Sequence, residues 1–85
     1  MNINVFDAMV FKREIGTSCS VAVKMLDTLK DGIVLSIEQN LVDSTGLAFI
    51  TNFVNQHKLN LLLDSEHYFI STGTLKPSSQ YAWDS

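Results

Sequence analysis

The chain has 85 residues, of which 46% are hydrophobic and 18% charged, and its formal net charge is −3. This balance is typical of one small globular domain with a single core rather than of a disordered chain. The six Lys and Arg residues are spread along the chain without a basic patch, so we expect no nucleic-acid partner. With one cysteine, no signal peptide and no apolar stretch near the roughly 20 residues of a membrane helix, we expect a soluble, cytoplasmic protein without membrane insertion.

The N-terminal half predicts a strand followed by a helix. Apolar residues alternate approximately with period 2 over residues 3–15, which indicates one strand or a short hairpin. Thr17 and Ser18 then fit a helix start, and Gly32 fits the glycine after a helix end. An amphipathic helix from about 18 to 30 would place these apolar residues on one stripe: Val21, Ala22, Met25, Leu26 and Leu29.

The next 30 residues predict a strand, a helix and a second strand. The β-branched run 33–37 reads as a strand buried on both faces, and 59–63 as a second buried strand after a turn at His57-Lys58. Asp43-Ser44-Thr45 opens the helix between them. Two strands joined by a helix form a βαβ crossover. The expected buried face of the helix comprises Leu47, Ile50, Phe53 and Val54.

The C-terminal part is less patterned. Residues 65–72 fit either a short third helix or an edge strand, and both alternatives stay open. From Pro77 the chain is polar. We therefore expect a single domain over residues 1–76 and a C-terminal tail over 77–85.

The segment from Gly32 to Leu47 resembles the signature of STAS domains, the family of bacterial anti-sigma factor antagonists and of a subunit of lipid-transport complexes. In that signature a buried strand and a short loop lead into Asp-Ser-Thr-Gly-Leu at the start of an amphipathic helix, and residues 43–47 match it position by position. The resemblance implies a small STAS-like α/β sandwich, with a mixed β-sheet and helices packed mainly on one face.

The resemblance also implies a function: a non-enzymatic regulatory module that docks a protein partner, such as a kinase-like anti-sigma factor. The partner would bind Asp43, Ser44, Thr45, Gly46 and Leu47. Ser44 occupies the position that is phosphorylated in some family members. A phosphate adds up to about two negative charges, which a helix N-terminus tolerates and a partner surface fitted to a neutral hydroxyl does not.

Each of these residues also has a structural interpretation. Asp, Ser and Thr at a helix start are ordinary caps. Phe49, beside the apolar stripe, either widens the core face or, if exposed, adds an apolar contact next to Ser44.

Other chemistry is disfavoured by the sequence. His57, His67 and Cys19 lack the spacing of metal ligands, so we expect no metal and no cofactor. Asp64 and Glu66 are candidates for an acid/base pair, but carboxylates after a strand are usually solvated and no oxyanion donor is evident, so we expect no enzyme. The alternative function is an accessory subunit of a larger assembly, of the lipid-transport type or a homodimer that completes the short sheet.

Overall fold

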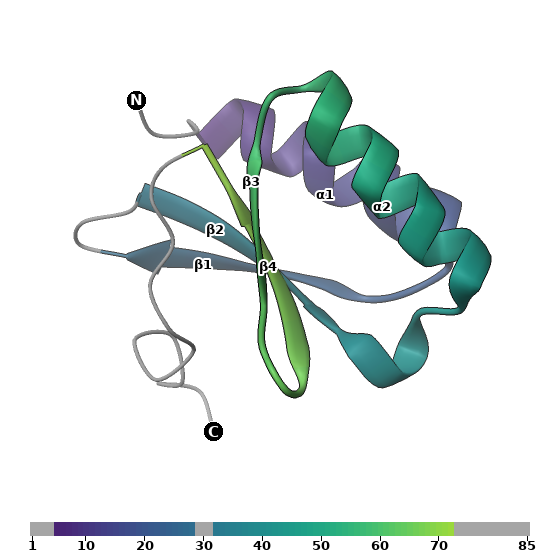
Figure 1. Cartoon of the computed structure of the whole chain (residues 1–85). Helices are drawn as coiled ribbons and strands as arrows, with labels where there is room; N and C mark the ends of the chain where they lie inside the picture. The colour runs from purple at the N-terminus through teal and green to yellow at the C-terminus, as the bar shows by residue number, and fades with distance from the viewer. Residues whose placement is uncertain (1–4, 29–31, 73–85) are drawn as a thin grey trace.

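The computed structural model describes residues 5–28 and 32–72, which form two α-helices, one 3-10 turn and a four-stranded sheet (Figure 1). In chain order the elements are α1 (Val5–Cys19), β1 (Val23–Thr28), β2 (Gly32–Glu38), η1 (Gln39–Leu41), α2 (Ser44–Gln56), β3 (Asn60–Leu63) and β4 (His67–Ser71). The predicted tail over 77–85 and the domain boundary at 76 lie outside the described residues. Within the described ranges, no helix is long and apolar enough to cross a membrane.

The N-terminal half has the opposite secondary structure to the one predicted. Helix α1 occupies most of the stretch predicted as a strand, and β1 lies within the stretch predicted as a helix. Ala8, Phe11, Ile15 and Cys19 follow one another at intervals of 3, 4 and 4, so they share one face of α1. Ala8 and Ile15 are fully buried, and Phe11 and Cys19 pack against the core. This helical spacing was the signal in the sequence that the period-2 interpretation missed.

Strand β1 is held in place by its pairing with β2. The two strands form an antiparallel hairpin whose register runs from Val23 opposite Ile37 to Thr28 opposite Gly32. Gly32 has a positive φ of 72°, a conformation that glycine adopts without strain. The expectation that this glycine ends a helix was therefore wrong, because it begins β2 after the connection of the hairpin.

The sheet has the strand order β1-β2-β4-β3, and all three pairings are antiparallel. The predicted mixed sheet is therefore wrong. Since β2 and β3 are both antiparallel to β4, they run parallel to each other, as a β2-α2-β3 crossover requires. However, β4 lies between them, so β2 and β3 are not neighbours.

The three later strands match the predictions to different degrees. Residues 33–37 of β2 are all buried, as predicted. Strand β3 exists as predicted but is an edge strand, and Leu63 is 64% exposed, so the expectation of a fully buried strand was wrong. Residues 65–72 contain β4, which is a central strand rather than a helix or an edge strand, and Tyr68 to Ser71 are buried.

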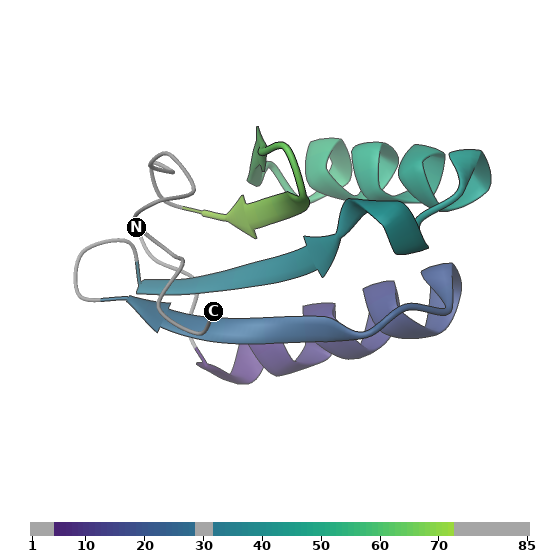
Figure 2. The same ribbon diagram turned by 90° about the horizontal axis from the view of Figure 1, so that it is seen from below.

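Both helices pack on the same face of the sheet (Figure 1 and Figure 2). Side chains from α1 and α2 share one apolar cluster with Leu35 and Ile37 of β2 and Ile70 of β4. Helix α2 contributes these buried residues: Ile50, Phe53 and Val54. The strand residues on the opposite face form a smaller cluster of Leu26, Val34 and Phe69. The main core is thus a helical layer on an antiparallel sheet.

Candidate functional site

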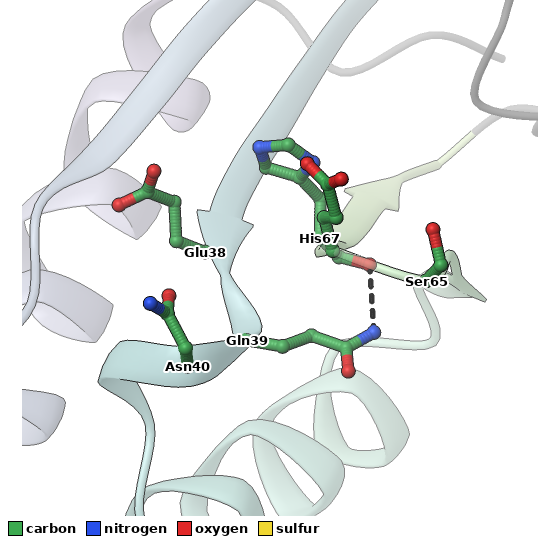
Figure 3. A pocket seen from close by; sticks show the side chains of 6 residues that line it. Glu38, Gln39, Asn40, Ser65 and His67 are labelled. Atoms are coloured by element: carbon green, nitrogen blue, oxygen red, sulfur yellow. Dashed lines mark hydrogen bonds between the residues drawn. The ribbon is translucent and has the colours of Figure 1, made fainter.

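The segment that carries the family resemblance forms a well-anchored corner between β2 and α2. We call residues 41–47 the η1–α2 corner. Immediately before it, the backbone N–H of Gln39 donates to the carbonyl oxygen of Glu66 over 2.9 Å. The side-chain amide of Gln39 also donates to the carbonyl oxygens of Asp64 and His67, the latter over 3.1 Å (Figure 3). Gln39 thereby ties η1 to the turn between β3 and β4.

Asp43 is the N-cap of α2, as predicted. Its backbone is extended, with φ of −84° and ψ of −178°, and its carboxylate Oδ1 accepts a hydrogen bond from the N–H of Gly46 over 2.7 Å. The carbonyl of Asp43 accepts the N–H of Leu47 over 2.9 Å. The bond to Gly46 satisfies a donor that a helix start otherwise leaves unpaired, and the bond to Leu47 is the first backbone bond of the helix itself. Capping therefore accounts for Asp43 whether or not a partner binds there.

Gly46 has a structural role of its own. It is buried, and a Cβ atom at this position would lie 3.0 Å from Cγ1 of Val42 and 3.6 Å from Cβ of Cys19. The thiol of Cys19, in the last turn of α1, points at the carbonyl oxygen of Gly46 over 3.5 Å. The glycine thus allows the end of α1 to approach the first turn of α2 closely. As a buried residue, Gly46 is placed to shape the corner rather than to contact a partner.

Burial raises the pKa of the Cys19 thiol, and the nearby negative charge of Asp43 adds to the shift. Both effects disfavour the thiolate, which is the nucleophilic form. Cys19 is half-buried in the last turn of α1. Cys19 therefore contributes packing and a weak hydrogen bond at the α1–α2 contact.

The exposed side chains of the η1–α2 corner are both polar and apolar. Ser44 and Thr45 are exposed in the first turn of α2. Leu47 was expected on the buried face of the helix, but it is 38% exposed, so that prediction was wrong. Leu41, which the sequence analysis did not single out, is 51% exposed in η1. Along the chain, two accessible leucines therefore flank the accessible hydroxyl of Ser44.

Phe49 lies behind this surface. It is half-buried, packs against the main core, and its ring centroid is 5.7 Å from that of Phe53. The interpretation of Phe49 as part of a widened core face is confirmed, and the alternative of a fully exposed contact residue is wrong. Of the residues predicted to bind a partner, Asp43, Ser44, Thr45 and Leu47 are exposed.

A polar pocket of about 470 Å³ lies beside the corner, between η1 and the β3–β4 turn. Figure 3 shows the side chains that line it: Glu38, Gln39, Asn40, Ser65, Glu66 and His67. Of the proposed acid/base pair, only Glu66 lines this pocket. Oδ2 of Asp64 accepts the N–H of Glu66 over 3.3 Å and lies 3.8 Å from Nδ1 of His67. Asp64 thus stabilises the turn between β3 and β4.

The two histidines occupy unrelated positions. His57 caps the C-terminus of α2, and its ring lies 4.4 Å from that of Phe53 and 5.0 Å from that of Phe11. His67 begins β4, and its ring stacks on Phe69 at 5.6 Å. In residues 5–28 and 32–72, no group of three or more His, Cys, Asp or Glu side chains has an arrangement suited to a metal ion.

No family model matches the chain, and comparisons with curated proteins and with solved structures gave no match.

Proposed function

We propose that this chain is a non-enzymatic protein-binding module of the STAS type, which docks a regulatory partner through the η1–α2 corner. The observation that carries the proposal is the exposure of Leu41 and Leu47 on either side of the exposed Ser44. When a partner covers large apolar side chains at the surface, their burial contributes about 25 cal/mol of binding free energy per Å² of apolar area.

The rigidity of the corner favours the same function. The Asp43 cap, the close α1–α2 contact at Gly46 and the Gln39 bonds to the β3–β4 turn hold these side chains in one arrangement. A preorganised surface loses less conformational entropy when a partner binds than a flexible loop does.

Phosphorylation of Ser44 would regulate the interaction. The hydroxyl is exposed for a kinase, and the N-terminus of α2 tolerates added negative charge, so the fold would persist. Between Leu41 and Leu47, however, the phosphate would have to enter an apolar contact beside the carboxylate of Asp43. Desolvation and like-charge repulsion would then release the partner.

The test is capture of binding proteins from native lysate by the tagged chain, read by mass spectrometry. We expect a protein captured by the wild type to be lost with Ser44→Asp and with the double variant Leu41→Lys/Leu47→Lys, and to be retained with Ser44→Ala. Met9→Lys is the matched control, because Met9 is 57% exposed in α1, outside the corner. Circular dichroism would establish that every variant is folded. Capture of the same proteins by all variants would show that the corner is only a helix cap.

A further inference from the structure

One edge of the sheet is built differently from the other. Strand β1 carries the exposed charged residues Lys24 and Asp27, a common protection of an edge strand against pairing with other chains. Strand β3 has the sequence Asn-Leu-Leu-Leu and no charge between residues 60 and 63. Leu63, at 64%, is the most exposed of the large apolar residues described. An uncharged, apolar edge of this kind is suited to pairing with another strand.

The hydrogen bonds of the β3–β4 hairpin show which groups of β3 face this edge. The N–H of Asp64 donates to the carbonyl of His67 over 2.9 Å, so Asp64 and His67 form a hydrogen-bonded pair. Such pairs alternate along an antiparallel ladder, which makes Leu62 and Phe69 the next one. The N–H and C=O groups of Leu61 and Leu63 therefore point away from β4. In the described residues no strand pairs with that side of β3.

We propose that β3 pairs with β3 of a second copy of this chain, in antiparallel register about a two-fold axis at Leu62. Leu61 of each copy would lie opposite Leu63 of the other, and these are the residues whose backbone groups face outward. Two such pairs would form, each exchanging two backbone hydrogen bonds. The two four-stranded sheets would join into one eight-stranded sheet. The proposal is independent of the η1–α2 corner.

The side chains fit the same register. Leu61 packs against the main core on the helical face, and alternation places Leu63 on that face too. Leu61 of one copy would therefore cover the exposed Leu63 of the other. Leu62, which packs against the smaller cluster, would meet its own equivalent on the opposite face. The pairing thus covers the apolar surface that β3 leaves exposed.

The charges that flank β3 are complementary only when two copies run antiparallel. Lys58 precedes the strand, and Asp64 and Glu66 follow it. Antiparallel pairing brings Lys58 of each copy toward the acidic end of the other, whereas parallel pairing would place like charges together. Charge complementarity of this kind is the reason to assign the edge to a second copy rather than to an unrelated strand.

The first experiment is mass determination by light scattering over a range of concentrations. The wild type should reach twice the 9.5 kDa chain mass, and Leu63→Lys should return it to the single chain mass. Met9→Lys is the matched control, because it places the same charge on an exposed apolar side chain of α1, outside both the edge and the corner, and should leave the dimer intact. A wild type that stays monomeric at all concentrations, or a dimer unaffected by Leu63→Lys, would overturn the proposal.

A disulfide test fixes the register. The test uses Leu62→Cys in a Cys19→Ser background. The two introduced cysteines of the dimer would form a non-hydrogen-bonded pair whose Cα atoms lie about 4.5 Å apart, a distance that a disulfide can span. Mild oxidation should link most of the chains. Asn60→Cys in the same background should give little linkage, since four residues of extended chain would separate the two thiols by about 13 Å. Equal linkage of both variants, or none for Leu62→Cys, would refute the register. Because neither experiment changes a residue of the η1–α2 corner, the dimer proposal and the partner-binding proposal can be refuted separately.

Discussion

Replacing Asp43 by alanine tests whether the first residue of the Asp-Ser-Thr-Gly-Leu segment is a helix cap. The substitution removes the acceptor Oδ1 and leaves the N–H of Gly46 without its 2.7 Å bond. Loss of an N-cap acceptor costs about 1 kcal/mol of stability, within a range of about 0.5–2. For a domain of this size, 1 kcal/mol lowers the melting temperature by about 4–8 °C.

Asp43→Asn is the matched control for this prediction. The asparagine side chain keeps an acceptor oxygen at the same place and caps about as well as aspartate, but it carries no charge. We therefore expect Asp43→Asn to melt within about 2 °C of the wild type, below half the shift expected for alanine. Thermal and urea unfolding followed by circular dichroism would measure both variants.

The result separates two physical effects. If both substitutions destabilise equally, the charge of Asp43 at the helix N-terminus matters and the hydrogen bond does not. If neither changes the stability, Asp43 is not an effective cap and the reasoning above is wrong. A stable Asp43→Asn variant that no longer binds a partner would show that the residue also contributes its charge to the interface.

Two further predictions follow from burial. Because the pKa of the Cys19 thiol is raised in the folded chain, the neutral thiol contributes stability below the ordinary pKa of 9.0, and this contribution is lost as pH rises through the higher folded-state pKa. In urea unfolding at alkaline pH, the wild type should therefore lose more stability than Cys19→Ser. Equal losses would contradict the burial argument. Ile50→Ala should cost about 2–5 kcal/mol in urea unfolding because Ile50 is fully buried, whereas Leu47→Ala should stay within about 0.5 kcal/mol. A large cost for Leu47→Ala would show that this leucine belongs to the core after all.

The sequence alone determined the structure wherever the signals were local. Three such signals were predicted correctly, and each spans only a few residues: the β-branched run of β2, the Asp43 cap and the Ile50-Phe53-Val54 stripe of α2. Capping and amphipathic spacing act over one or two helical turns, so a single sequence is enough to identify them.

Tertiary structure decided the elements whose identity depends on distant partners. The stretch that contains β1 has apolar residues that fit a helical stripe, but pairing with β2 and burial on both faces make it a strand. In the same way, β4 is a central strand and β3 an edge strand because β4 pairs with β2. No local sequence pattern predicts which of the two strands of the β3–β4 hairpin pairs with β2. The candidate site also combines features that the sequence predicts and features that only the tertiary structure sets. The sequence placed Ser44 at a helix start, while the packing of the end of α1 on Gly46 and the exposure of Leu41 and Leu47 depend on contacts between segments far apart in the chain.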